Sequence, residues 1–226
     1  MSLDRLITAC VRPLALRRLR VLVTSEVGPK AAASVLSSTR RLERARENEL
    51  PQEQTVGARV MVRLAALTNA AFDALLEHGF AEPHARRLTV AVAWQVYRVL
   101  ARPTWWISRL LARDRIRRVH YTMCMLVRFP YAAPGYRMTL LPPSDTEAGF
   151  DVHRCPVADY FRSRGRLDLC AQAFCDLDYA LARQWGVQLV RPRTLSRGFA
   201  LCDFRFRPPA GEAGSVPGFS TPTAGK

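Results

Sequence analysis

Apolar residues in the first half of the chain recur at the spacing of a helix. Over residues 56–78 and again over 82–100 they fall three and four positions apart, which places them along one stripe of a helix. Gly79 follows the first of these segments and is typical of a helix end. We therefore expect a helical hairpin here, followed by a short helix over residues 104–113.

The first 55 residues are basic and only weakly patterned. Short helices are predicted over residues 3–21 and 31–48, and residues 49–53 have the composition of a linker. An arginine-bearing amphipathic helix of this kind either lies on a membrane surface or packs on the neighbouring domain, and we favour packing. Residues 1–55 are thus predicted to be a helical extension of a main domain over residues 56–207.

Beyond residue 117 the pattern changes to alternation, which is typical of strands. Short alternating segments are separated by turn-forming residues, and one longer segment keeps helical spacing. We expect strands over residues 118–127, 136–141, 150–153, 187–190 and 199–206, and a helical stretch over residues 157–185. The predicted fold class is α+β: an N-terminal helical hairpin packed with a mostly antiparallel sheet, and a cysteine-rich helix in the C-terminal half. The tail over residues 208–226 is dense in Pro, Gly, Ser and Thr, and we expect it to be disordered.

The formal net charge of +15 points first to nucleic acid or to an anionic membrane as the partner. Nearly all of the positive charge is arginine, however, since lysine occurs only at positions 30 and 226. The sequence has neither the aromatic motif of an RNA-recognition domain nor the spacing of a zinc finger. We therefore expect a small-molecule substrate as the partner and not nucleic acid, and we leave open whether the chain forms an oligomer.

The hydropathy pattern and the cysteines bear on location. No apolar run reaches the roughly 20 residues needed to cross a bilayer, and the basic N-terminus lacks the apolar core of a signal peptide. We expect no transmembrane segment and a cytoplasmic location, where the six cysteines would be free thiols. Four of the cysteines, at positions 155, 170, 175 and 202, lie in the C-terminal half and point to chemistry there.

Asp178 stands out in the helical stretch because its neighbours on the helix surface are apolar. Helical geometry places it about 80° around the helix from Cys170, between Phe174 and Cys175. A buried carboxylate is costly unless it is paired. Two explanations remain open: an ion pair with an arginine of the helical hairpin, or a general base or amine anchor in a substrate pocket.

Cys155 precedes Pro156, which is favoured in the first turn of a helix, so Cys155 is predicted at a helix N-terminus. Such a position lowers the pKa of a thiol, so Cys155 is either a reactive thiol or ordinary packing. His153 and Arg154 directly precede it and add a proton carrier and a positive charge. The cysteines lack the C-x2-C pair of structural zinc sites, so we expect neither a metal nor another cofactor.

Several short motifs in this block occur in the same order as in a known family. They are Cys155-Pro156, Leu169-Cys170, Phe174-Cys175-x-x-Asp178, Thr194-x-x-x-Gly198 and Cys202-x-Phe204. With these motifs, residues 56–207 resemble the L-2-amino-thiazoline-4-carboxylic acid hydrolase family. The resemblance implies hydrolysis of a cyclic amidine, in which water adds to the ring carbon between nitrogen and sulfur and the ring opens to N-carbamoyl-L-cysteine.

Such a reaction needs a base or nucleophile at that carbon, a proton donor for the departing ring atom and a cation for the substrate carboxylate. Candidate catalytic residues are Cys155, Cys175, Asp178 and His153. Either cysteine would be the nucleophile, the aspartate a base or amidinium partner, and the histidine a proton shuttle. Candidate substrate-binding residues are Cys170, Arg154, Arg197 and Phe174, with one of the two arginines holding the carboxylate.

The chain is thus predicted to be a hydrolase acting on a cyclic amidine or related C–N bond, such as that of a 2-amino-thiazoline-4-carboxylate, in specialised metabolism. A diverged family member could act on another thiazoline, amidine or amide. The alternative is a non-catalytic protein that holds a small molecule or a metal in a cysteine-bearing pocket. Retained zinc or iron would favour this alternative, and one hyper-reactive thiol in metal-free protein would favour the enzyme.

Overall fold

The predicted helical hairpin forms in the computed structural model, which describes residues 2–209. α2 (Val56–Glu77) buries its apolar stripe in the core and ends at the predicted turn. α3 (Glu82–Leu111) follows and continues through Pro103 without a break. The short helix predicted over residues 104–113 is therefore the last part of α3 and not a separate element.

α1 (Leu3–Ala45) joins the two helices predicted near the N-terminus into one kinked element. The kink lies at Gly28, whose backbone angles (φ 84°, ψ 169°) are accessible to glycine, and Pro29 begins the second arm. The apolar face of α1 packs on α2 and α3 and shares one hydrophobic core with the C-terminal half. Its buried residues include Val11, Leu16, Leu19, Val23, Val35 and Leu36.

The strand predicted over residues 118–127 is wrong, because this segment is helix α4 (Arg115–Leu126). The carboxylate of Asp114 caps the helix by accepting a hydrogen bond from a first-turn amide at 2.9 Å. Val119 and Met123, four positions apart, are both buried. These two residues also belong to the alternating pattern, so the apolar positions are compatible with both a strand and a helix. Packing against α3 and the sheet favours the helix.

Four short strands form one sheet in which every pairing is antiparallel, as predicted. They are β1 (Arg137–Leu140), β2 (Ala148–Arg154), β3 (Gln188–Val190) and β4 (Cys202–Arg207), in the spatial order β1-β2-β4-β3. The register sets Phe150 opposite Phe204 and Val152 opposite Cys202. Because side chains alternate along a strand, these four share one face of the sheet, and all four are buried.

The helical stretch predicted over residues 157–185 is interrupted twice. It consists of α5 (Pro156–Arg162), α6 (Leu167–Cys170), a π-helical turn (Ala171–Cys175) and α7 (Leu177–Gln184). Gly165, with a φ of 66°, separates α5 from α6. In the π turn the amide of Asp176 donates to the carbonyl of Ala171, five residues earlier, at 2.7 Å.

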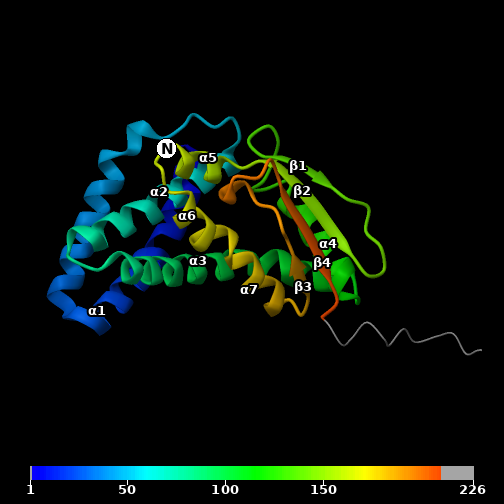
Figure 1. The fold of residues 1–226 in the computed structure, drawn as a ribbon, viewed down its shortest axis with the longest axis horizontal. Coiled ribbons are helices and arrows are strands. Elements are labelled where there is room, and N and C mark those ends of the chain that lie inside the picture. Colours follow the sequence, from blue (N-terminus) through cyan, green and yellow to red (C-terminus); the bar gives the residue numbers. More distant parts are fainter. Residues whose placement is uncertain (1, 210–226) are drawn as a thin grey trace, which may run out of the picture.

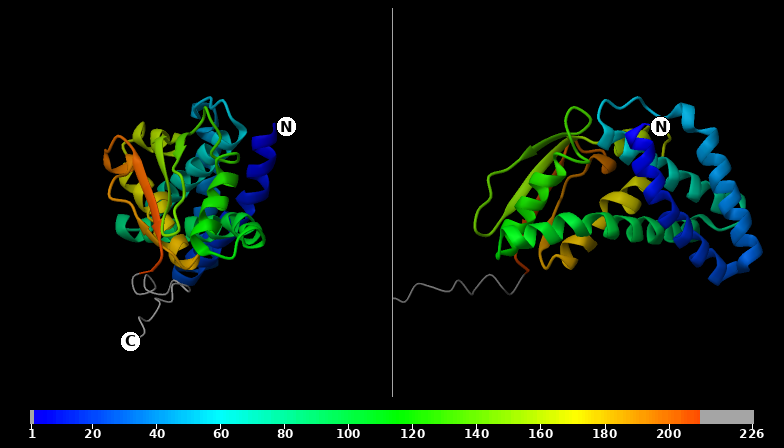
Figure 2. Two further views of the ribbon diagram at one scale, coloured as in Figure 1. Left: turned by 90° about the vertical axis from the view of Figure 1, so that its right-hand side faces the viewer. Right: turned by 180° about the vertical axis from the view of Figure 1, so that it is seen from behind.

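α3 connects the two ends of the molecule. Figures 1 and 2 show α1 and α2 at one end, the sheet and α4 at the other, and α3 running between them. The π turn and α7 pack on α3, and buried side chains of all these elements form one core. The C-terminal half therefore meets the helical hairpin along α3.

Two further sequence predictions concern membranes and the tail. Over the described range, every helix falls short of the length and apolarity that a bilayer crossing requires. The predicted disordered tail lies outside the described residues from position 210 onward.

Replacing Asp114 with alanine would remove the capping acceptor of α4. We expect the free energy of unfolding to fall by about 1 kcal/mol, the typical loss for an N-cap residue, as measured by urea unfolding. Asp145→Ala is the matched control, because its side chain is 94% exposed and lies 3.6 Å from the guanidinium of Arg117. The control should cost less than about 0.5 kcal/mol. Native stability in Asp114→Ala would contradict the capped helix.

Candidate active site

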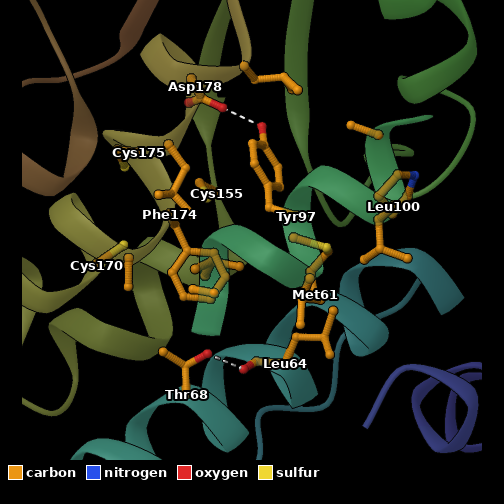
Figure 3. Close-up of a pocket in the computed structure, with 18 of the residues that line it drawn as sticks. Met61, Leu64, Thr68, Tyr97, Leu100, Cys155, Cys170, Phe174, Cys175 and Asp178 are labelled. Atoms are coloured by element: carbon orange, nitrogen blue, oxygen red, sulfur yellow. Dashed lines mark hydrogen bonds between the residues drawn. The ribbon is translucent and has the colours of Figure 1, made fainter. Parts of the chain in front are cut away.

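A cavity of about 230 Å³ lies where the helical hairpin meets the sheet and the π turn. Its wall is mostly aliphatic and aromatic, with side chains from α1, α2 and α3 on one side and from the C-terminal half on the other. Figure 3 shows Asp178 and Cys175 on one wall, and Met61 and Leu64 on the other. Five of the eight predicted site residues line the cavity: Cys155, Cys170, Phe174, Cys175 and Asp178.

Asp178 lies in the first turn of α7 and faces the cavity. Its Oδ2 accepts a hydrogen bond from Nη1 of Arg191 at 2.7 Å, and its Oδ1 accepts one from the phenol of Tyr97 (Figure 3). Burial raises the pKa of Asp178, whereas Arg191 and Tyr97 act in the opposite direction. Both partners donate, so the two oxygens of Asp178 act as hydrogen-bond acceptors that face a guanidinium and a phenol.

Arg191 follows β3 and is the most deeply buried charge of the site, with 1% of its side chain exposed. Its Nη2 donates to the carbonyl of Cys175 at 2.8 Å, and its guanidinium lies over the rings of Tyr179 and Phe204. The sequence interpretation that paired Asp178 with an arginine of the helical hairpin is wrong. The cation comes from the C-terminal half, and the hairpin supplies a phenol instead.

The π turn places Cys170 and Cys175 close together on the cavity wall. In a regular helix these residues would lie about 140° apart, and the wider turn aligns them. The hydroxyl of Ser196 donates to the sulfur of Cys175 at 3.2 Å, and the thiol of Cys170 lies nearby. The thiol of Cys170 and the hydroxyl of Ser196 lower the pKa of Cys175 to about 7, while the pKa of Cys170 is raised. Cys175 is therefore the thiol of the site that ionises near neutral pH.

Cys155 is the residue directly before the first turn of α5, where the sequence places it. Burial nevertheless raises its pKa to about 12, and the nearby amides of Ala158 and Val157 only partly oppose this. Cys155 is thus a protonated thiol at neutral pH, beside the hydroxyl of Tyr136. It faces the cavity as a hydrogen-bond donor and not as the anion expected at a helix N-terminus.

Cys202 on β4 is the fourth cysteine that faces the cavity. Its sulfur accepts a hydrogen bond from the amide of Leu195 at 3.2 Å, and burial raises its pKa. Within residues 2–209, no three His, Cys, Asp or Glu side chains are grouped as ligands for a metal ion. The acidic and nucleophilic groups on the cavity wall are thiols, phenols and one carboxylate.

His153 lies away from the cavity. It follows the cavity-facing Val152 on β2, and because side chains alternate along a strand it points to the opposite face of the sheet. There its Nε2 lies 3.2 Å from the hydroxyl oxygen of Thr139.

The two predicted carboxylate-binding arginines are also outside the cavity. Arg154 pairs with the buried carboxylate of Glu53 at 2.8 Å. Arg197 pairs with Asp176 at 3.2 Å on the molecular surface. Both guanidinium groups are therefore matched to carboxylates of the protein itself.

Tyr97, Arg191 and Ser196 join the site without having been singled out by motif or spacing. Tyr97 directly follows Val96 on the apolar stripe of α3, a position from which a phenol reaches the core. Arg191 and Ser196 lie in the irregular segment between β3 and β4. No periodicity there indicates which side chains turn inward.

Asp178→Asn would leave the guanidinium of Arg191 buried without a charged partner. We expect a loss of about 3 kcal/mol in the free energy of unfolding, as when one partner of a buried pair is removed. Adding Arg191→Met should recover most of this loss, because no charge then remains buried. Asp176→Asn, whose partner Arg197 is exposed, should cost less than about 1 kcal/mol. Equal losses for the two Asp→Asn variants in urea denaturation would contradict a buried pair.

The thiolate of Cys175 should make it the fastest cysteine to alkylate at neutral pH. Its pKa of about 7 means that the iodoacetamide rate rises through pH 7, whereas Cys155, with a pKa of about 12, stays slow until strongly alkaline pH. Peptide mass spectrometry would follow each site. Ser196→Ala removes one donor and should move the Cys175 profile to higher pH. Faster labelling of Cys155 than of Cys175 would contradict this assignment.

Comparison with known protein families finds a match to L-2-amino-thiazoline-4-carboxylic acid hydrolase over residues 94–206, half of the chain. The match contains the carboxylate, phenol and thiol groups that line the cavity: Tyr97, Tyr131, Tyr136, Cys155, Cys170, Cys175, Asp178 and Cys202. No curated protein and no solved structure matches the chain. The chain belongs to the L-2-amino-thiazoline-4-carboxylic acid hydrolase family.

Proposed function

We propose that the protein hydrolyses a cyclic amidine of the thiazoline type, with Cys175 as nucleophile and Asp178 as the group that orients the amidine. One observation carries this proposal: a thiol with a pKa of about 7 and a half-buried carboxylate, three residues apart, face the same cavity. The family match over residues 94–206 supports a hydrolase and includes both residues.

The electrophile in such a ring is the carbon bonded to two nitrogens and one sulfur. The thiolate of Cys175 adds to this carbon, and the electron pair of the C=N bond moves to the ring nitrogen, which takes up a proton. The ring C–S bond then breaks, and the departing sulfur leaves as a thiol after protonation. Cys155 and Cys170 are protonated thiols that line the cavity, and either can donate the proton to the departing sulfur.

Water completes the reaction by adding to the same carbon, now bonded to Cys175. The bond from carbon to the Cys175 sulfur breaks, which restores the thiolate and releases a urea that carries a free thiol. Overall one water is consumed, and the ring C–S bond is the bond that is lost. For a 2-amino-thiazoline-4-carboxylate the product is an N-carbamoyl cysteine.

Asp178 suits an orienting role better than that of a general base. Two donors, Arg191 and Tyr97, already hold its oxygens, and a carboxylate has further lone pairs that accept an N–H from the amidine. The accepted bond would fix the ring with its carbon toward Cys175. We assign no role to His153, Arg154 or Arg197, because none of them lines the cavity.

Turnover should depend on Cys175 and on pH. Release of the ring-opened urea from 2-amino-thiazolines, followed by mass spectrometry, should rise with pH through about 7 as Cys175 ionises. Cys175→Ser should slow turnover by about 10²-fold or more while the melting temperature is kept. Cys124→Ser is the control, because Cys124 does not line the cavity.

Two results would contradict the proposal. Full turnover in Cys175→Ser would assign the attack to water and leave Asp178 as the base. Tight ligand binding without turnover in the native protein would favour the non-catalytic binding protein instead.

A further inference from the structure

The described lining of the cavity includes acidic groups but no cationic side chain. Among the described residues that line it, Asp178 is the one carboxylate, and no arginine, lysine or histidine faces it. Arg191 does not line the cavity. Its two Nη groups donate hydrogen bonds to Asp178 and to the carbonyl of Cys175. Its Nε is buried and has no partner among the described residues. The cavity therefore offers no cation to a ligand.

A ligand with a free carboxylate would bring a further negative charge close to Asp178 and the ionisable thiol of Cys175. Burying a carboxylate without a cation is costly, and a like charge at short range adds to that cost. The arginines suggested for this role, Arg154 and Arg197, are paired with Glu53 and Asp176 outside the cavity. The carboxylate group of a 2-amino-thiazoline-4-carboxylate would therefore meet no cationic side chain in this cavity.

The wall opposite Asp178 is suited to hydrocarbon. Figure 3 shows Met61, Leu64 and Leu100 on this wall, and their side chains contribute no hydrogen-bond donor. An apolar cavity of about 150 Å³ stays dry and binds benzene. The present cavity of about 230 Å³ has room for a ring together with an apolar substituent.

The route into the cavity is apolar as well. Leu100 lines the cavity and is 42% exposed, so the apolar lining continues to the molecular surface at this residue. Ile107 and Leu111 follow seven and eleven positions later on the same face of α3, and both are exposed. A ligand that enters here meets hydrocarbon before it meets the carboxylate.

We propose that the ligand is a lipophilic amidine without negative charge: a thiazoline-type ring whose remaining substituent is a hydrocarbon or a masked carboxyl group. The ring end lies at Cys175 and Asp178, and the substituent lies against Met61 and Leu64. The assignment of a reactive ring rests on the proposed function, whereas the preference for an apolar, uncharged substituent rests on the cavity wall alone.

The test uses three 2-amino-thiazolines that differ only at ring position 4: carboxylate, carboxamide and n-butyl. Binding to the native protein and to Cys175→Ser, in which ring opening is blocked, is measured by calorimetry at pH 7.5 with reductant present. We expect the carboxamide to bind at least about tenfold more tightly than the carboxylate, because the two differ in charge and little in shape. The butyl compound should bind more tightly still, by about fourfold for each CH₂ group buried.

A variant of the apolar wall supplies an independent control. Met61 is half-buried on α2 and lines the cavity, outside the groups assigned to catalysis. Met61→Lys adds a flexible cation, so the ratio of carboxylate to carboxamide affinity should rise at least about tenfold. Met61→Leu keeps the apolar wall and should leave that ratio unchanged.

Tighter binding of the carboxylate than of the carboxamide by the native protein would overturn the inference. Absence of binding by the butyl compound would overturn it too. If the apolar preference holds but none of the three rings is opened, the hydrolase proposal fails and the inference stands. Because the ligand series uses the native protein, the inference is tested even if Met61→Lys does not fold.

Discussion

The arrangement of the site depends on the buried ion pair between Asp178 and Arg191. An arginine whose side chain is 1% exposed is tolerated only where its charge is paired and its N–H groups are hydrogen-bonded. Asp178 pairs with the charge, and Asp178 and the carbonyl of Cys175 accept hydrogen bonds from the two Nη groups. The pair joins α7 to the segment after β3, and Tyr97 extends the connection to α3. The same contacts that stabilise the junction of hairpin and sheet therefore fix the carboxylate beside the thiols.

The π turn accounts for the second part of the site. Its wider turn brings Cys170 toward Cys175, and the neighbouring thiol together with the hydroxyl of Ser196 lowers the pKa of Cys175 to about 7. The carbonyl of Cys175 accepts from Arg191, so the turn and the ion pair support one another. A regular helix would separate the two sulfurs, and burial alone would then raise the pKa of both cysteines, as it does for Cys155.

The sequence pattern predicted those elements whose form follows from local residue spacing. It failed for the elements and contacts whose form depends on the folded chain. The hairpin, the antiparallel strands and the position of Cys155 before α5 follow from spacing and from Pro156. The segment of α4 was assigned to a strand because its apolar residues fit both periods. The choice of Arg191 as partner of Asp178 could not be predicted, because Arg191 lies in a segment without periodicity. The π turn could not be predicted either, because it departs from the regular helical period that the sequence pattern indicates. A raised pKa of Cys155 likewise depends on how deeply the folded chain buries it.

The two sides of the cavity come from different parts of the chain. Residues 94–206, which match the family, supply the carboxylate, phenols and thiols. Much of the facing apolar wall comes from α1, α2 and the start of α3, before the matched segment begins. The polar groups of the cavity and much of its apolar wall are thus separated along the sequence. Because the N-terminal helices share the core and line the cavity, changes in them can alter which substituent fits without disturbing Cys175 or Asp178. The shape of the cavity therefore depends on residues that lie outside the segment matched to the family.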